Sequence, residues 1–527
     1  MDRAPAAYLT SIVLVTALSS AIFLVALAWK LFKWVWLNPK KLEKLLRQQG
    51  FRGNSYIPVL GDVIAMSTLL KQAHSKPINL SDDIVPRIIP EYLDLVKKHG
   101  KNTYIWYGPE PSVCIQDPEL IREASQNINL FHKPVVNQLT RLLAPGLISY
   151  NGDKWAKHRK LINPAFHGEK LKLMLPSFCT SATAMLRKWE EIISPTGFCE
   201  LDVWPSLRSL SSDAISRTAF GSNYEEGRVI FELQGEQCEL CIKSLWSMLI
   251  PGWRFLCRFL PTKRNRRMGQ IFKDVTDSIR EIINSRLNEI RAGEFGDDDF
   301  LGLLLQSNSQ EIDRHGNKDF GMTIEEVIEE CRLFYVAGQE TTSVLLVWTL
   351  ILLSVHQEWQ TRARDEVLQV FGTRIPDFDG LNHLKLVTMV LYEVLRLYPP
   401  IPVNGRITAA ETKLGNLSLP SGVLVLIQTL LVHHDQAIWG EDAKEFNPER
   451  FSQGASHATK GNIAFFPFGW GPRSCIGQSY AMLEAKLVLA MILQRFWFKL
   501  SPSYSHAPIS LVTLKPQYGA PLILHKL

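Results

Sequence analysis

The stretch FGWGPRSCIG, residues 468–477, places one cysteine, Cys475, in a glycine-rich segment that leads into an apolar run at residues 481–494. The run predicts a helix, and the free backbone N–H groups at a helix N-terminus stabilise a thiolate, the form of cysteine that binds metal. Gly471 and Gly477 allow the backbone to turn around the sulfur and to approach a flat ligand. Arg473 can donate to a nearby carboxylate. A buried structural cysteine is the alternative, but the closely spaced glycines and the arginine favour a ligand.

These ten residues resemble the haem-binding loop of the cytochrome P-450 superfamily. The resemblance implies a mainly α-helical P-450 fold with small β-sheets and one N-terminal transmembrane helix. It also implies a haem b cofactor whose iron is axially ligated by Cys475, with Phe468 and Arg473 among the haem-binding residues. In this superfamily the thiolate pushes electron density toward cleavage of the O–O bond.

The composition fits one large globular enzyme. Of the 527 residues, 46% are hydrophobic and 21% are charged, and a formal net charge of +6 is small for this length. The sequence has no basic stripe with interleaved aromatic residues of the kind that binds nucleic acid. Eight cysteines over this length do not predict a disulfide framework. Cys238 and Cys241 form a lone C-x-x-C, which we interpret as two positions on one helix rather than a zinc site.

The N-terminal segment predicts a membrane anchor. Residues 4–29 carry no charge and would span roughly 39 Å as a helix, enough to cross a bilayer with tilt. The run is too long for a cleaved signal peptide, and a buried core helix is disfavoured because nothing interrupts it. Aromatic residues close the run as an interfacial belt, at Trp29, Phe32, Trp34 and Trp36. Basic residues follow it, at Lys30, Lys33, Lys40, Lys41, Lys44 and Arg47.

By the positive-inside rule, this charge bias predicts a single-pass protein of the endoplasmic reticulum membrane whose catalytic domain faces the cytosol. We divide the chain into an anchor at 1–37, a basic linker at 38–60 and a haem-thiolate catalytic domain at 61–527. Two glycosylation sequons, at Asn79 and Asn416, lie in that domain and should remain unmodified in the cytosol.

Local patterns predict a mainly helical domain with few strands. A short basic helix is expected at 38–49, strands at 104–106 and 112–115, and mostly helix from 119 to 370. A loop is expected at 376–380, a strand at 423–430 and a closing β-region at 496–527.

The motif AGQETT, residues 337–342, lies inside a helix predicted from Thr323 to His356. Its glycine costs about 1 kcal/mol of helix stability relative to alanine, and a threonine hydroxyl can bond to a carbonyl one turn earlier. Incidental polar residues are the alternative reading of this motif taken alone. By resemblance it is the oxygen-activation motif of the distal helix, with Thr341 as the proton-delivering hydroxyl and Glu340 as its acid partner.

Glu393 and Arg396 lie three residues apart on one face of an apolar helix predicted at 386–398. A pair of this kind is usually solvated at the surface. Together with Arg450 it resembles the Glu-Arg-Arg network of the superfamily, which supports the cysteine loop. The loss of one partner from such a buried network would cost several kcal/mol.

Haem carries two propionates, which need cationic partners. By resemblance, Trp155 and Arg159 match the W-x-x-x-R helix that reaches a propionate, and Arg406 and Arg473 supply further cations. We interpret His158 as a surface histidine, because the thiolate already fills the axial role.

Residues 38–53 and 259–268 resemble plant P-450 family seventy-two, subfamily A. Members of that family oxidise terpenoids: triterpenoid saponin skeletons, iridoid glucosides and gibberellins. By resemblance, the pocket would be lined by parts of 129–144, 244–255, 333–341 and 401–404. The apolar segment 244–260 suggests a substrate lid at the bilayer surface, with a core segment as the alternative.

The leading hypothesis is a membrane-anchored haem-thiolate monooxygenase of the EC 1.14 type, which inserts one atom of O₂ into a C–H bond of a lipophilic terpenoid. Electrons would come from NADPH through NADPH–cytochrome P-450 reductase, because the chain has no Rossmann glycine fingerprint. The basic residues around Arg159 and Arg473 suggest a positive docking face for this acidic partner. One alternative is a haem-thiolate isomerase or dehydratase acting on a peroxide, which would not need Glu340 and Thr341. The other is a non-catalytic haem-binding sensor.

Overall fold

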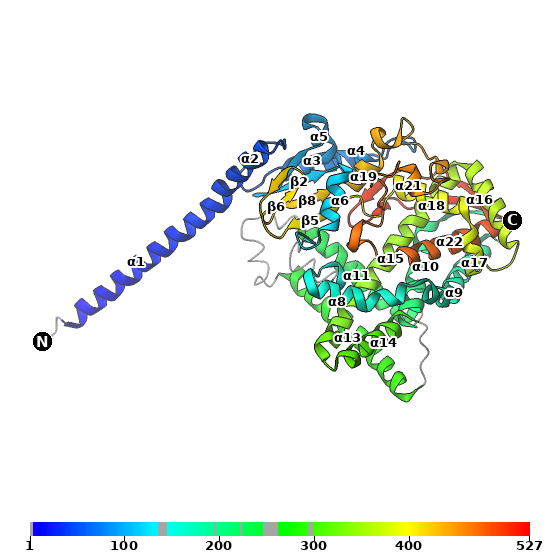
Figure 1. Ribbon diagram of the computed structural model, residues 1–527, viewed down its shortest axis with the longest axis horizontal. Coiled ribbons are helices and arrows are strands. Elements are labelled where there is room, and N and C mark those ends of the chain that lie inside the picture. The colour runs from blue at the N-terminus through cyan, green and yellow to red at the C-terminus, as the bar shows by residue number, and fades with distance from the viewer. Residues whose placement is uncertain (1–3, 135–144, 194–196, 222–223, 246–261, 294–298) are drawn as a thin grey trace.

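The structure, a computed structural model, describes residues 4–134, 145–193, 197–221, 224–245, 262–293 and 299–527. These residues are mainly helical and carry four small sheets. The predicted fold class is therefore confirmed. Figure 1 shows a long N-terminal helix, α1 (Ala4–Phe32), projecting from one side of a body that contains the remaining elements.

The helices of the body lie in every part of the chain. They are α2 (Asn38–Gln48), α3 (Val63–Ala73), α4 (Val85–Ile88), α5 (Pro90–His99), α6 (Pro118–Gln126), α8 (Gly152–Ile162), α9 (Gly168–Ile193), α10 (Val203–Phe220), α11 (Tyr224–Leu245), α13 (Lys263–Ala292), α14 (Phe300–His315), α15 (Ile324–Val355), α16 (Gln357–Phe371), α17 (Phe378–His383), α18 (Lys385–Leu397), α19 (Thr429–His433), α20 (Gln436–Trp439), α21 (Ala455–Ala458) and α22 (Gln478–Arg495). Short 3-10 turns are η2 (Gly146–Ile148), η3 (Asn163–Phe166), η5 (Lys318–Phe320), η6 (Pro448–Phe451) and η7 (Gly471–Arg473).

The long helix α15 runs through the core. It begins after Thr323, whose hydroxyl accepts the N–H of Glu326 while the Glu326 carboxylate accepts the N–H of Thr323. This reciprocal capping box satisfies two N–H groups that a helix start would otherwise leave unpaired. Every residue from Thr342 to Ser354 is buried. The predicted helix is confirmed to within one residue at each end.

The largest sheet has the strand order β1-β2-β8-β5-β3. Its strands are β1 (Thr103–Tyr107), β2 (Glu110–Ile115), β3 (Phe131–His132), β5 (Asn404–Thr408) and β8 (Leu424–Ile427). β3 pairs antiparallel with β5, so that His132 lies opposite Ile407. This pairing brings the segment after β3 next to β5, although the two are far apart in sequence.

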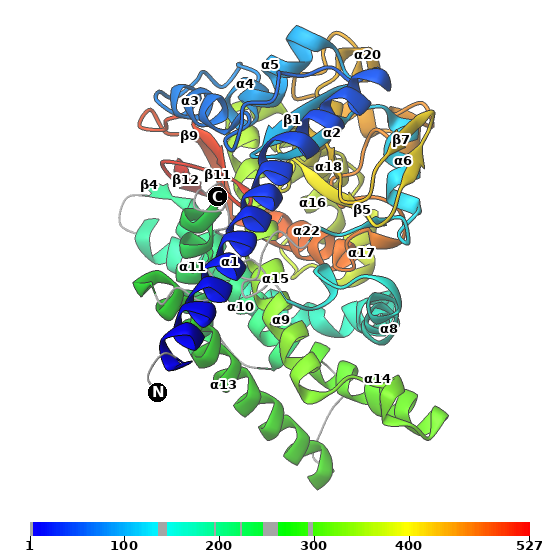
Figure 2. The ribbon, with the colours of Figure 1, turned by 90° about the vertical axis from the view of Figure 1, so that its left-hand side faces the viewer.

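The other sheets are small. β4 (Phe198–Asp202), β12 (Pro521–Lys526) and β9 (Phe496–Leu500) form one, and two hairpins join β6 (Thr412–Leu414) to β7 (Leu417–Leu419) and β10 (Pro508–Ser510) to β11 (Leu514–Pro516). Figures 1 and 2 show α13 and α14 at the end of the body away from the five-stranded sheet. The closing β-region is confirmed. The loop expected at 376–380 is partly wrong, because the Asp377 side chain accepts the N–H of Gly380 at 2.7 Å and starts α17.

The N-terminal helix is exposed along its described side chains. None of its apolar residues from Ile12 onward is buried, whereas the other long apolar helix, α15, is mostly buried and belongs to the core. A π-helical turn, η1 (Lys33–Leu37), joins α1 to α2, and the Tyr56 hydroxyl donates to the Val35 carbonyl there at 2.7 Å. An exposed apolar helix of this length fits a membrane anchor.

Candidate active site

The cysteine loop closes on itself immediately before α22. The N–H of Cys475 donates to the Phe468 carbonyl at 2.8 Å, and the N–H of Ser474 donates to the Gly471 carbonyl at 3.0 Å. Gly471 has a φ of +73°, and a Cβ there would lie 2.8 Å from the Ser125 carbonyl oxygen at the end of α6. Glycine is therefore required at this position by both conformation and space.

The environment of Cys475 favours a ligand role for its sulfur. Burial raises the pKa of the thiol, whereas the N–H of Gly477 and the Arg159 guanidinium lower it. The side chain is nevertheless accessible to water, unlike the buried Cys114, Cys241 and Cys331. A thiol whose pKa is raised in this way still becomes a thiolate when a bound metal ion supplies positive charge.

A cluster of cations lies beside this loop. We use the name propionate cluster for Lys133, Arg159, Arg406 and Arg473. Burial, together with the charges of Arg406 and Arg473, lowers the pKa of Lys133 to about 7. Burial also lowers the pKa of Arg406 and of Arg473 to about 10. Among the described residues, the buried Nε atoms of Arg406 and Arg473 have no hydrogen-bond partner. Cations that repel one another and keep unused donors match an anionic ligand with more than one carboxylate.

Four segments that are distant in sequence bring this cluster together. From α8, Arg159 donates to the Ser474 carbonyl at 2.9 Å. The Arg473 guanidinium lies over the Trp155 ring, 4.6 Å from its centroid, and Nη2 donates at 2.8 Å to the Tyr150 carbonyl. Arg406 comes from β5 and is buried. Arg159 and Arg473 are half-buried and bonded to these carbonyls.

Lys133 was not predicted from the sequence. It follows β3, and the pairing of β3 with β5 places it near Arg406. The Lys133 N–H donates to the Asn151 side chain at 2.9 Å, and Asn151 also accepts from Arg473 at 2.8 Å. Only the strand register, which no local motif encodes, could have revealed this residue.

The predicted relay residues lie next to each other on α15. The Thr341 hydroxyl donates to the Ala337 carbonyl at 2.8 Å, the back-bond expected from the sequence. The Glu340 carboxylate lies 3.7 Å from Nζ of Lys515 on β11, a partner that the sequence did not predict. A Cβ on Gly338 would lie 2.7 Å from Cδ1 of Ile215, so glycine permits the close packing of α10 against α15.

The expectation that His158 lies on the surface is wrong. Its side chain is fully buried, with Nδ1 2.6 Å from Oε1 of Glu330 on α15. The other oxygen of Glu330 accepts the N–H of Leu147 at 3.0 Å. His158 follows the buried Trp155 by three residues, so both lie on the inward face of α8. This spacing was the signal that could have predicted its burial.

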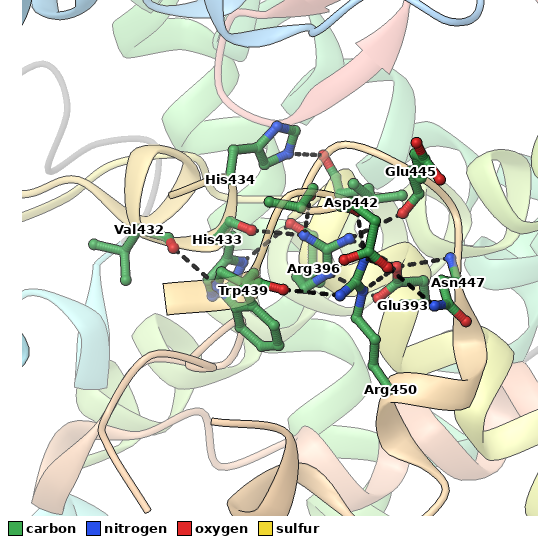
Figure 3. Close-up of polar contacts among 12 residues, drawn as sticks. Glu393, Arg396, Val432, His433, His434, Trp439, Asp442, Glu445, Asn447 and Arg450 are labelled. Atoms are coloured by element: carbon green, nitrogen blue, oxygen red, sulfur yellow. Dashed lines mark hydrogen bonds and ion pairs between the residues drawn. The ribbon is translucent and has the colours of Figure 1, made fainter. Parts of the chain in front are cut away.

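The Glu393–Arg396–Arg450 network is present (Figure 3). The Glu393 and Arg396 side chains are fully buried and joined by two hydrogen bonds of 2.7 Å. Nε of Arg450 lies 3.4 Å from the same Glu393 carboxylate. The predicted network is confirmed, and the alternative of a solvated surface pair is wrong.

Comparison with known proteins identifies the family. Residues 87–519 match the cytochrome P450 family. The chain belongs to the cytochrome P450 family. It is 58% identical over 515 residues to cytochrome P450 CYP72A219 of Panax ginseng, and the matched region covers 98% of this chain and 99% of that protein. It is 57% identical over 500 residues to cytochrome P450 72A397 of Kalopanax septemlobus, with 95% of each chain covered. It is also 50% identical over 519 residues to cytochrome P450 72A68 of Medicago truncatula, with 98% of each chain covered.

As a cytochrome P450, the protein is a haem-thiolate monooxygenase. Its residues fit that cofactor, because an accessible sulfur in a glycine-rich loop lies beside cations whose donors remain unused. A Cβ on Gly477 would lie 3.9 Å from both the Cys475 sulfur and the Phe166 ring.

Other predicted features of this P450 are partly described. Cys238 and Cys241 lie on the single helix α11, and no group of three or more metal-ligating side chains occurs within the described ranges. Residues 135–144 of the predicted pocket and 246–260 of the predicted lid lie outside the described residues.

Proposed function

We propose that this cytochrome P450 oxidises a lipophilic plant terpenoid of the triterpenoid, iridoid or gibberellin type, with Cys475 as the axial ligand of the haem iron. The meeting of the Cys475 loop with the propionate cluster supports the ligand role most strongly. The identity of 50–58% to cytochrome P450 72A proteins supports the substrate class. A flat, dianionic cofactor would take the Cys475 thiolate as a metal ligand and would accept hydrogen bonds from the unused donors of the propionate cluster.

The residues around the cysteine loop would hold the cofactor. Trp155, Arg159, Arg406 and Arg473 would bind the propionates, and Phe468 closes the loop through its carbonyl. When bound, haem supplies the iron at which O₂ is activated and the C–H bond is oxidised.

The proton relay would be formed by two residues of α15. The Glu340 carboxylate is partly exposed beside Lys515 and takes up protons from the solvent side. The Thr341 hydroxyl, which donates to the Ala337 carbonyl, rotates to pass a proton toward the oxygen being reduced. The overall reaction consumes two electrons and two protons, places one oxygen atom in the substrate and releases the other as water.

The electron donor would be NADPH–cytochrome P450 reductase at the endoplasmic reticulum, because both proteins would be held at the same cytosolic membrane face. The exposed N-terminal helix and the basic residues that follow it support this location.

The test is a reconstitution of the full chain with the reductase in membranes under ¹⁸O₂, with triterpenoid, iridoid and gibberellin scaffolds as substrates. We expect an NADPH-dependent product that carries one ¹⁸O atom per oxidation and is absent without the reductase. Turnover without NADPH would instead favour the isomerase or dehydratase. The absence of product from the whole panel, with intact haem-thiolate enzyme, would contradict the terpenoid assignment.

A further inference from the structure

His433 lies beside the Glu393–Arg396–Arg450 network (Figure 3) and contacts the segment that leads into the cysteine loop. It is the last residue of α19 and is fully buried. Its carbonyl accepts Nη1 of Arg396 at 2.8 Å, and its Nδ1 lies 3.2 Å from the Arg396 carbonyl. Arg396 and His433 are therefore joined in both directions.

The second ring nitrogen of His433 reaches the chain just before the cysteine loop. The backbone N–H of Phe466 donates to Nε2 at 3.2 Å. Because a backbone N–H can only donate, Nε2 is unprotonated and Nδ1 carries the proton that is donated to Arg396. Burial lowers the pKa of His433 to about 3, with Arg396 and His434 contributing, so the ring stays neutral near pH 7.

Phe466 is connected to Cys475 through two further backbone hydrogen bonds. The Phe466 carbonyl accepts the N–H of Gly469 at 2.9 Å, and the Phe468 carbonyl accepts the N–H of Cys475 at 2.8 Å. The His433 ring also stacks on Phe465, with centroids 5.7 Å apart and an interplanar angle of 25°. One imidazole thus connects the buried network to the start of the loop.

We propose that His433 is a positioning residue for the haem-thiolate bond, because it fixes Phe466 relative to Arg396 and thereby holds the loop in the conformation that presents Cys475. This inference rests on the proposed role of Cys475 as the ligand. The Glu-Arg-Arg network then acts on the loop through the acceptor atom Nε2, and not only through general packing.

Two substitutions separate the two bonds of the ring. The amide of asparagine ends near the position of Nδ1, so His433→Asn keeps the donor to Arg396 and loses the acceptor for Phe466. The longer amide of glutamine reaches the position of Nε2, so His433→Gln keeps that acceptor. In His433→Asn the buried N–H of Phe466 is left without a partner, which destabilises the conformation of the loop. We therefore expect the red-shifted ferrous–carbon monoxide band of this variant to be lost roughly tenfold faster than that of the wild type, as the protein changes to the form without thiolate.

The measurement follows that band over time in full-length holoenzyme in nanodiscs, together with the thermal unfolding of each variant. His434→Gln is the matched control, because His434 contacts Asp83 and the Leu397 carbonyl and not the loop. We expect His433→Gln and His434→Gln to keep the band lifetime within about twofold of the wild type. Equal lifetimes for His433→Asn and His433→Gln would overturn the proposal.

If His433→Asn yields no holoenzyme, the proposal is tested by His433→Gln alone. A band lifetime of His433→Gln well below that of His434→Gln would then overturn the proposal. The experiment separates this inference from the proposed ligand. A wild-type protein without the thiolate band would refute the role of Cys475, whereas a normal wild-type band with equal variants would refute only the role of His433.

Discussion

The charged residues of the Glu393–Arg396–Arg450 network and those of the propionate cluster differ in how their charges are balanced. Glu393 and Arg396 neutralise each other inside the network, so the loss of either partner would leave the other charge buried and uncompensated. Lys133, Arg406 and Arg473 instead repel one another, which costs stability until an anionic group binds between them. We assign the first group to the scaffold and propose the second as part of the cofactor site.

Removal of one charge from the network tests this distinction. Glu393→Gln leaves Arg396 charged and buried, so we expect the free energy of unfolding to fall by about 3–5 kcal/mol in chemical denaturation. The control is Glu449→Gln, which removes an exposed ion pair with Arg362 nearby and should cost less than about 1 kcal/mol. Equal losses in the two variants would contradict the assignment.

Glu484 predicts a dependence of stability on pH. It is fully buried on α22, where burial raises the pKa of its carboxyl to about 8 while the Ser211 hydroxyl donates to it at 2.9 Å. Above the ordinary value of 4.5, the unfolded chain loses this proton and the folded protein keeps it. The contribution of the protonated Glu484 carboxyl to the free energy of unfolding is therefore complete below pH 4.5. It is lost as the pH rises to about 8, by about 1.4 kcal/mol per pH unit.

Glu484→Gln has no proton to lose at this position. We expect its free energy of unfolding to fall less steeply than that of the wild type between about pH 5.5 and about pH 7.5, as measured by urea denaturation. Parallel pH profiles for the two proteins would show that Glu484 ionises normally in the folded state.

Among the elements, α15 connects the chemistry to the core. It carries Thr341 and Glu340 near its middle, and Glu330 nearer its start binds His158 of α8. The helix that bears the proposed relay is thus tied to the helix that bears Trp155 and Arg159. A shift of one would displace the other, because both partners in the tie are fully buried.

The relay can be tested at this scale by Thr341→Ala. We expect product formation per NADPH consumed to fall by about a hundredfold, at the low end of general acid–base effects, with released peroxide rising in its place. Thr349→Ala removes the same kind of back-bond two turns further along α15, from the Thr349 hydroxyl to the Leu345 carbonyl, and should leave this ratio unchanged. A normal ratio in Thr341→Ala would exclude the relay role.

The whole molecule combines a mainly helical body with an exposed apolar helix at its N-terminus (Figures 1 and 2). Its topology can be tested with the two sequons, because Asn79 and Asn416 are both exposed. We expect neither to carry a glycan in a eukaryotic host, since the proposed topology places the body in the cytosol. A shift in mobility after glycosidase treatment that disappears in Asn79→Gln or Asn416→Gln would place the body in the lumen.

Contiguous sequence patterns predicted the elements and one part of the site well. The cysteine loop, the helix α15 and the Glu393–Arg396 pair are each encoded within a short window, where local geometry decides the structure. Lys133, Lys515 and His433 meet the site through strand register and helix packing between distant segments. Their roles could not be predicted, because those contacts depend on the assembled fold rather than on local sequence.

The identity of the thiolate ligand is the central claim, and the difference spectrum of the reduced, carbon monoxide-bound protein tests it most directly. We expect the wild type and the control Cys199→Ala, which changes a cysteine on β4, to show the red-shifted band of a haem-thiolate protein. Cys475→Ala should bind haem without that band. A red-shifted band in Cys475→Ala, or its absence from the wild type, would contradict the claim.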